Sequence, residues 1–284
     1  MFVDENESWL EHCSKPAFFL KIMIVPEDQR NMNNKEFPEN MVPLGDKEFP
    51  FDCHPGVACF TKCCRNVDLT LYPYDIIRLK INLGIASAEF LRLYTQLHKG
   101  ENPFFPTVKL RLTEDEEKAC PFLQTSGCSV YEDRPSACRT YPLERAVDRS
   151  NAQKIPEEYY FLTDHAYCFG HKEDKKFGAK SWIRNQRVSE YNVFNDYWAE
   201  LDTLFAKNPW KGEGVAGEKQ RLSFLVCYNI DGFRQLVEAR KILQQFSLEK
   251  AQRRRIDADD SELLKFGLEW LKLVLTGKSS LVRK

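Results

Sequence analysis

The chain has 284 residues, enough for one large domain or two modest ones with a sizeable apolar core, so disulfide bonds are not needed for bulk stability. Its 41 Lys and Arg residues nearly balance 42 Asp and Glu residues, and a formal net charge of -1 gives no global electrostatic case for nucleic acid or an acidic membrane surface. The N-terminus is acidic, unlike a secretory signal, and no apolar run is long enough to span a bilayer. We therefore expect a reducing cytoplasm, where clustered cysteines are more often metal ligands or redox groups than disulfides.

Residues 1–47 are predicted to form a leader. It contains a short strand over 18–25 and a polar loop over 26–40. His12 and Cys13 also lie in this leader. Because a lone Cys-His pair far from a cluster is usually incidental, neither residue is assigned to a site.

Eight of the ten cysteines lie in the next segment, which we expect to be a metal-chelating domain over 48–175. Four of them fall within twelve residues, and the others punctuate a turn-rich region downstream. So much sulfur in a chain that needs no disulfides indicates metal ligation. The eight candidate ligands are Cys53, Cys59, Cys63, Cys64, Cys120, Cys128, Cys138 and Cys168.

Two helices are predicted directly after the first four cysteines. A strand over 67–71 leads to Pro73, which suits the first turn of a helix because its missing N–H costs nothing there. Apolar residues continue at helical spacing up to Gly84, which is typical of a C-terminal cap. A second helix is expected from Ser87 to Tyr94, and together the two helices would support the cysteine cluster.

The second half of the cysteine region is predicted to contain short strands and one short helix. Alternation over 104–112 predicts a half-buried strand. Residues 120–131 resemble a hairpin with Gly127 at its tight bend. Pro135 is then expected to begin a short helix that carries Cys138 toward this hairpin.

The chain is predicted to be helical over 176–284. Apolar residues recur three and four positions apart over 182–205, 221–246 and 260–275. Cys227 lies within an apolar run, where burial is the better explanation. The predicted fold is therefore α+β, with an irregular cysteine-rich core, short strands, supporting helices and a helical C-terminal half.

Four thiolates can hold a tetrahedral zinc ion or a cubane iron–sulfur cluster. Eight thiols allow one cluster with spare thiols, two mononuclear sites, or a larger polynuclear site. Successive side chains diverge, so Cys63 and Cys64 are expected to serve different metals, or only one of them is a ligand.

Several neighbouring residues leave alternatives open. Either His165 or His171, or His54 beside Cys53, could replace a thiolate on zinc. Arg134 and Arg139 are the cations we expect to offset the negative charge of the thiolates. Cys138 or Cys168 could instead pair with a histidine as a catalytic nucleophile, but metal ligation explains a cysteine among seven others more simply. The glycine-rich stretch 212–217 follows a predicted helix rather than a strand, so we interpret it as an interhelical loop rather than a nucleotide-binding turn.

Several stretches of the cysteine region form a combined pattern. They are the runs 51–64, 69–79 and 83–85, with C-P-F-L at 120–123, G-C-S-V-Y at 127–131 and R-P-S-A-C-R-T-Y-P at 134–142. This pattern resembles the YkgJ family of cysteine-cluster proteins, described as zinc- or iron-chelating domains. The resemblance covers roughly residues 48 to 170 and implies metal ligation by the eight cysteines named above. The first family motif is C-x-x-C-x-x-C-C, whereas the gaps here are five and three residues.

This family in turn is similar to flagellin lysine N-methylases, which are iron–sulfur proteins that use S-adenosylmethionine. The resemblance implies an enzymatic alternative with S-adenosylmethionine as cofactor and a protein as substrate, but a shared cysteine framework does not transfer a methyl-transfer site. The main hypothesis is a metal-binding protein that holds an iron–sulfur cluster or zinc, with iron–sulfur preferred because the thiols exceed what one zinc needs. A structural zinc protein acting as an interaction module is a further alternative.

Overall fold

The computed structural model describes residues 37, 42–100, 102–149, 156–213 and 216–284, which form an α+β structure. The fold class predicted from the sequence is confirmed. The predicted strand over 18–25 and the residues His12 and Cys13 lie outside the described residues. The α-helices are α1 Pro73–Leu83, α2 Ser87–Tyr94, α3 Ser136–Thr140, α4 Ala179–Asn185, α5 Val188–Phe205, α6 Glu218–Tyr228, α7 Ile230–Ala239, α8 Lys250–Ala258 and α9 Asp260–Thr276.

The strands of the described residues pair into four two-stranded antiparallel sheets: β1 with β8, β2 with β3, β4 with β5, and β6 with β7. Their bounds are β1 Glu48–Pro50, β2 Thr95–His98, β3 Thr107–Leu110, β4 Leu123–Gln124, β5 Gly127–Cys128, β6 Leu143–Asp148, β7 Glu157–Leu162 and β8 Lys176–Gly178. Four 3₁₀ turns complete the order: η1 Lys62–Cys64, η2 Tyr131–Asp133, η3 Gly170–Lys172 and η4 Ile242–Gln245.

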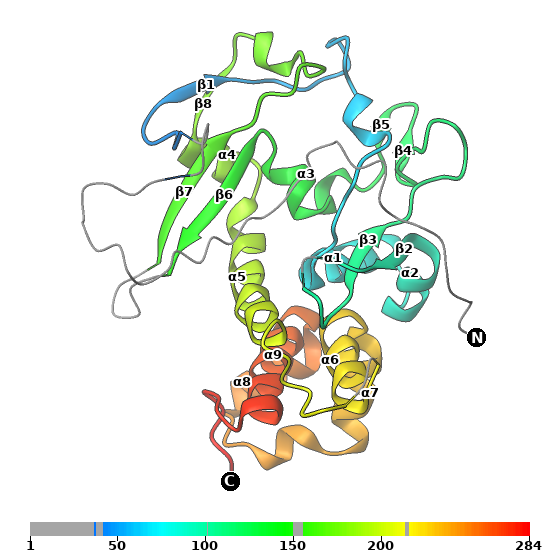
Figure 1. Cartoon of the computed structure of the whole chain (residues 1–284), viewed down its shortest axis with the longest axis vertical. Coiled ribbons are helices and arrows are strands. Elements are labelled where there is room, and N and C mark those ends of the chain that lie inside the picture. Colours follow the sequence, from blue (N-terminus) through cyan, green and yellow to red (C-terminus); the bar gives the residue numbers. More distant parts are fainter. Residues whose placement is uncertain (1–36, 38–41, 101, 150–155, 214–215) are drawn as a thin grey trace.

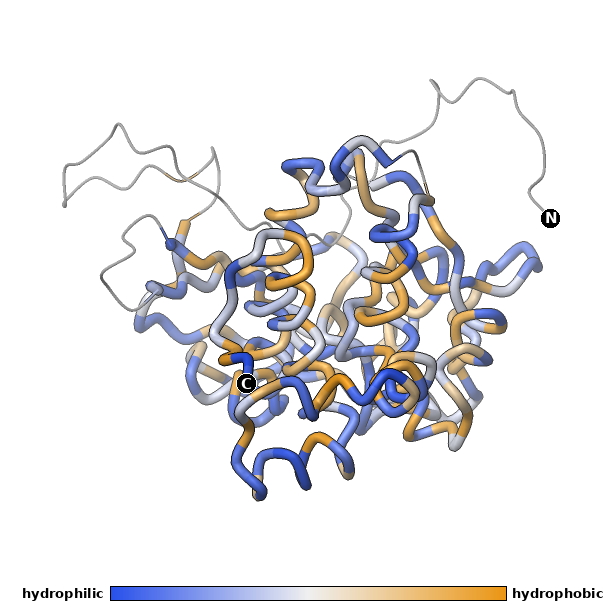
Figure 2. Tube along the Cα trace, turned by 90° about the horizontal axis from the view of Figure 1, so that it is seen from below, coloured by the Kyte–Doolittle hydropathy of each residue, from blue (hydrophilic) through white to orange (hydrophobic). Residues whose placement is uncertain are grey.

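The helices α6 to α9 gather at one end of the molecule and the short sheets lie toward the other, with α5 running between them (Figure 1). Seen from the helical end, hydrophobic and hydrophilic residues alternate along the helices (Figure 2), as expected for helices that bury one face. Within the described part of the chain, no helix is both long and apolar enough to cross a membrane.

Helices α1 and α2 confirm the predicted pair. Helix α1 begins at Pro73, and the side chain of Asp75 accepts a hydrogen bond from the N–H of Tyr72 at 2.9 Å, which satisfies one of the free donors of the first turn. The helix ends at Gly84, whose φ of 66° favours glycine. Local signals therefore fix both ends of α1.

The two long helices predicted after residue 180 are each interrupted. The predicted helix over 182–205 is divided into α4 and α5 because Arg187 adopts a left-handed conformation with φ of 53°. The predicted helix over 221–246 is divided into α6 and α7 at Asn229, whose side chain accepts a hydrogen bond from the N–H of Gly232 at 3.1 Å and caps α7. Helix α9 agrees with the predicted helix over 260–275, and it is capped by Asp259 and Gly277.

The strand predictions were less complete. The predicted strand over 104–112 is shorter, as β3, and the predicted strand over 67–71 forms only one bridge, from Thr70 to Lys109. The hairpin over 120–131 is confirmed as β4 and β5, with Gly127 at φ of 121°. Sheets β6–β7 and β1–β8 and strand β2 were not predicted, and β8 lies within the region 176–284 that was predicted to be helical. Helix α8 lies in that region but outside its three predicted apolar segments.

The main hydrophobic core joins α1, α2 and β3 to helices α5 to α9. Phe90, Phe205 and Phe233 are fully buried in it. Gly267 of α9 lets this helix approach closely, since a Cβ there would lie 2.7 Å from the ring of Phe233. This core draws on both the predicted cysteine domain and the predicted helical region, and the division at residue 175 stays a prediction.

A second, smaller core lies beneath part of the cysteine region. It contains six buried residues, and Cys168 and Tyr141 pack against it. The six are Leu44, Phe49, Phe51, Leu143, Phe177 and Trp182. This second core positions the segment that carries Cys168.

Candidate metal centre

The first contact between cysteine-bearing segments joins 51–53 to 168–170. The N–H of Asp52 donates to the carbonyl of Gly170 at 3.1 Å. A Cβ at position 170 would lie 2.8 Å from the carbonyl oxygen of Asp52 and 2.9 Å from the ring of Phe51. Only glycine therefore fits here without displacing its neighbours. Next to it, the N–H of Phe169 donates to the Cys59 sulfur at 3.0 Å.

The second contact joins the Cys63–Cys64 turn to the β4–β5 hairpin. The N–H of Cys120 donates to the carbonyl of Cys64 at 2.8 Å. The hairpin places Cys128 opposite Leu123. At its bend, Gly127 lies against the ring of Phe60, where a Cβ would be 3.3 Å away. The hairpin is therefore held against the loop that carries the first four cysteines.

The third contact brings α3, which carries Cys138, onto α1. The buried carboxylate of Asp75 accepts a hydrogen bond from the N–H of Ser136 at 2.8 Å while it caps α1. One side chain thus fixes the relative position of the two helices. As predicted, a short helix after Pro135 presents Cys138 to the hairpin cysteines.

The electrostatic interactions among the thiols define two groups. The first group is Cys53, Cys59 and Cys168. Burial, with smaller contributions from the nearby charges of Cys63, Cys59 and Cys168, raises the pKa of Cys53 to about 11. Cys59 and Cys168 also share a hydrogen bond.

The second group is Cys120, Cys128 and Cys138. Burial raises the pKa of Cys120 to about 11, and the charges of Cys128 and Cys63 act in the same direction. Desolvation also raises the pKa of Cys138, with further contributions from Cys120, Cys63 and Cys128. The Cys138 side chain nonetheless has access to solvent.

The Cys63–Cys64 pair lies between the two groups. Cys63 interacts with Cys53 of the first group and with all three thiols of the second. A hydrogen bond that the Cys63 thiol donates to its neighbour Cys64 is the main cause that raises the pKa of Cys63, followed by desolvation. These contacts and interactions link the eight candidate cysteines in a way that their order in the sequence did not indicate, and their role as ligands stays a prediction.

Backbone N–H groups are directed at sulfur atoms in both groups. The N–H groups of Phe122 and Leu123 act to lower the pKa of Cys120, and that of Val130 acts to lower the pKa of Cys128, each against a larger effect of burial. In the first group, the N–H of Gly170 acts in the same way on Cys168, and Cys59 accepts the bond from Phe169 already described. These bonds favour the thiolate, because a hydrogen bond donated to a charged sulfur stabilises that charge.

Two tyrosines beside the first group were missed from the sequence. The hydroxyl of Tyr141 and the Cys168 sulfur are hydrogen bonded, and desolvation together with this bond raises the pKa of Tyr141. Desolvation and the charges of Cys63, Cys168 and Cys59 raise the pKa of Tyr167. In the sequence, only their positions could have indicated a role at the site, since Tyr167 precedes Cys168 and Tyr141 lies three residues after Cys138.

The two arginines expected to offset thiolate charge have different surroundings. Arg134 is buried and its charge lowers the pKa of Cys128. Desolvation lowers the pKa of Arg134 itself, while the charges of Tyr131, Cys138 and Cys128 oppose that effect. Arg139 instead donates to the carbonyls of Gln186 and Glu132, both at 2.6 Å. Of the two, Arg134 therefore lies where the charge of the second group can be offset.

The candidate histidines are engaged by other groups. His54 accepts a hydrogen bond at Nδ1 from the N–H of Gly56 at 3.1 Å, and its Nε2 lies 3.4 Å from Glu173. His171 packs edge-on against Phe51. His165 stacks on the ring of Tyr167 with centroids 5.0 Å apart. These contacts favour the thiols over imidazole as the metal-binding groups.

Two other sequence interpretations can be compared with the structure. Cys227 is buried in the main core, as predicted. The described residues of the glycine-rich stretch 212–217 lie between α5 and α6, so this stretch follows a helix, as predicted for an interhelical loop.

Cysteine thiolates are ligands that suit zinc or iron, and the buried Arg134 can offset part of their negative charge. In the described part of the chain, no three Cys, His, Asp or Glu side chains stand in a formed metal-binding arrangement. The residues therefore fit a metal by the chemistry of their thiolates and by the placement of the segments that carry them.

Residues 52–168 match a protein family named CxxCxxCC and described as "Putative zinc- or iron-chelating domain". The match covers the whole span from the first candidate ligand to the last. No curated protein and no solved structure matches the chain. The family match supports zinc or iron chelation through the cysteines.

Proposed function

We propose that the protein chelates iron, as an iron–sulfur cluster, or zinc through its clustered cysteine thiolates. The observation that carries the proposal is the set of backbone hydrogen bonds that hold the cysteine segments together, from Phe169 to the Cys59 sulfur, from Asp52 to Gly170 and from Cys120 to Cys64. The family match over 52–168 supports the same chemistry.

We further propose two four-thiolate sites. Each group supplies three ligands, and the Cys63–Cys64 pair supplies one to each, since adjacent side chains point in different directions. The first site would use Cys53, Cys59 and Cys168, and the second would use Cys120, Cys128 and Cys138. This division follows from the interactions of Cys63 with both groups.

The residues around each group provide different compensation for negative charge. Four thiolates on one divalent ion leave about two net negative charges, which are costly to bury without compensation. Arg134 lies near the second group. The first group has no such cation among its described interactions and relies on hydrogen bonds from Tyr141 and from backbone N–H groups.

The metal is identified by anaerobic purification followed by elemental analysis and a visible absorption spectrum of the same sample. Iron with acid-labile sulfide and broad brown absorbance would support the iron–sulfur form, which we prefer. Colourless protein with stoichiometric zinc would replace it with zinc. Protein that contains neither metal, even after reconstitution under reducing conditions, would refute the proposal. A reducing cytoplasm would suit either form, since it keeps the thiols available.

Single cysteine substitutions test the division into two sites. Cys168→Ser and Cys138→Ser should each lower the ratio of metal to protein by about half, because each removes a ligand from a different four-thiolate site. Cys63→Ser should also lower bound metal and thermal stability. The matched control is Cys227→Ser, which should retain full metal content because Cys227 lies in the main core. Complete metal loss from every ligand variant would support one shared polynuclear centre instead.

No observation in the described residues favours a methylase that uses S-adenosylmethionine, so that alternative is not proposed.

A further inference from the structure

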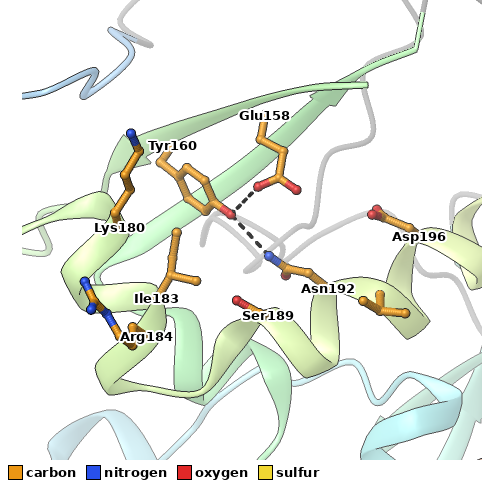
Figure 3. Close-up of a pocket in the computed structure, with 9 residues that line it drawn as sticks. Glu158, Tyr160, Lys180, Ile183, Arg184, Ser189, Asn192 and Asp196 are labelled. Atoms are coloured by element: carbon orange, nitrogen blue, oxygen red, sulfur yellow. Dashed lines mark hydrogen bonds between the residues drawn. The ribbon is translucent and has the colours of Figure 1, made fainter. Parts of the chain in front are cut away.

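A pocket of about 380 Å³ lies between β7, α4 and α5, and no cysteine lines it. Its size is in the range of small-molecule sites. Strand β7 contributes Glu158 and Tyr160, α4 contributes Lys180 and Arg184, and α5 contributes Asp196 (Figure 3). The pocket thus combines acidic, basic and hydroxyl groups from three elements.

The two carboxylates of the pocket already have partners. Glu158 accepts hydrogen bonds from Arg145 and from the hydroxyl of Tyr160, both at 2.7 Å. Asp196 accepts bonds from the buried Arg145 at 2.8 and 2.9 Å and pairs with Arg149 at 2.8 Å. A cationic ligand would have to compete with these arginines, so the acidic residues do not provide an open cation site.

The two cations of α4 have no acidic partner among the described residues. Lys180 and Arg184 are separated by four positions, which places them on the same face of the helix. Trp182, between them in sequence, faces the other way and donates its indole N–H to the carbonyl of Thr140 at 3.0 Å while it packs in the second core. The outer face of α4 is thus left with two exposed positive charges beside a pocket.

The remaining lining can contact the rest of a ligand. Asn192 is 8% exposed and holds its amide 3.2 Å from the hydroxyl of Tyr160, to which it donates. Ser189 adds a second hydroxyl to the lining. Ile183 and the exposed side chain of Val193 add apolar surface. The pocket therefore offers hydrogen-bonding and apolar contacts next to its two free cations.

We infer that this pocket binds a small organic anion, with its carboxylate or phosphate monoester group held by Lys180 and Arg184. Four cationic side chains line or bond the pocket against two carboxylates, so the local charge favours an anion. A guanidinium can donate two parallel hydrogen bonds to either anionic group, and the lysine adds a point charge. The metal-binding proposal is independent of this site.

The test titrates the purified full chain at low ionic strength with phenyl phosphate, benzoate and the neutral benzyl alcohol, and follows binding by calorimetry. The two anions distinguish a phosphate from a carboxylate preference. Lys180→Ala combined with Arg184→Ala removes both free cations. The matched control combines Lys250→Ala with Arg254→Ala, because these exposed residues have the same charges and spacing on α8 and have no acidic partner among the described residues.

We expect saturable binding of at least one anion, weakened about tenfold or more by the α4 double variant, since charge-assisted hydrogen bonds would be lost. The α8 double variant should bind as the wild type does, and added salt should weaken binding. Absence of saturable anion binding, equal binding by the α4 variant, or equally tight binding of benzyl alcohol would each overturn the inference. Circular dichroism of the variants checks that the exposed substitutions leave the fold intact.

Discussion

The helical end and the thiol-bearing region differ in what holds their segments together. Helices α6 to α9 share one large apolar core, in which Phe233, Leu264 and Leu271 are fully buried. The cysteine segments share less of that core, mainly through Phe122 and Val130 beside the β4–β5 hairpin. They otherwise meet through single hydrogen bonds and a second core of six buried side chains. The first region is stable through apolar burial, whereas the second gains most from ligands that tie its loops together.

The largest expected effect separates these two sources of stability. Phe233→Ala should lower the free energy of unfolding by about 3–5 kcal/mol, because a large aromatic ring is removed from a closely packed site beside Gly267. Urea denaturation followed by circular dichroism measures this loss. Metal content in the folded fraction should stay unchanged. The control is Leu97→Ala, which removes a side chain that is 57% exposed and should change stability by about 0.5 kcal/mol or less.

Loss of metal from the folded fraction of Phe233→Ala would contradict the separation of the two sources of stability. It would show that the thiol groups depend on packing in the helical end.

A second prediction concerns Asp75, which connects the two regions through α1 and α3. Burial raises the pKa of this carboxyl from 3.8 to about 6, although bonds from Tyr72 and Ser136 and the charge of Arg139 oppose the shift. Between these two pH values the native state retains a proton that the unfolded state has lost. Stability should therefore fall as the pH rises through this window, by about 3 kcal/mol in total, and Asp75 should cause no further change above it.

Asp75→Asn tests this pH dependence. The substitution keeps the size of the side chain and removes its titration, so the stability difference between wild type and variant should depend on pH between 3.8 and about 6 and then level off. Subtraction cancels groups whose titration is unchanged, but Cys138 and Tyr191 interact with Asp75 and must be checked, for example by repeating the series with Tyr191→Phe. A difference that does not vary with pH would contradict the raised pKa.

The third prediction concerns the contact between 51–53 and 168–170. Gly170→Ala should cost about 1–3 kcal/mol locally, because the new Cβ would lie 2.8 Å from the Asp52 carbonyl and force the segments apart. Elemental analysis should show loss of the metal held by the first group, while the second group retains its own. The control is Gly178→Ala, where a Cβ meets nothing within 4 Å and the cost should be below about 1 kcal/mol.

Full metal content in Gly170→Ala would contradict the assignment of Cys168 to a site with Cys53 and Cys59, because the substitution leaves every thiol in the chain intact.

The sequence allowed prediction of the elements whose ends depend on local chemistry. Pro73 and Gly84 delimit α1, and Asp259 and Gly277 delimit α9, because caps and left-handed glycines act within a few residues. The interruption at Arg187 was not predictable in this way, since arginine has no preference for the left-handed conformation it adopts there. The tertiary contacts at the break are made by the neighbouring Gln186, which accepts hydrogen bonds from Arg134 and Arg139.

Pairing between strands that are far apart in the sequence could not be predicted either. Strand β1 has three residues, and its partner β8 lies more than a hundred positions away, so neither segment carries a clear alternating pattern of its own. The grouping of the cysteines also depends on contacts between segments that are far apart in the sequence. Cysteine spacing identified the eight candidate ligands, but Cys168 joins Cys53 and Cys59 only because the second core and Gly170 bring the segments together.

The smallest expected effect comes from the cysteine that the comparison assigns to the helical end. Cys227→Ser places a hydroxyl in the main core, where burial without a partner would be unfavourable, but a serine within α6 can donate to the carbonyl four residues earlier, that of Ser223. The cost should therefore be about 1 kcal/mol, measured by urea denaturation beside Cys138→Ser. Metal content should be that of the wild type in Cys227→Ser and reduced in Cys138→Ser. The same change of one sulfur to oxygen would then act on packing in one region and on ligation in the other, and equal metal loss in both variants would contradict that distinction.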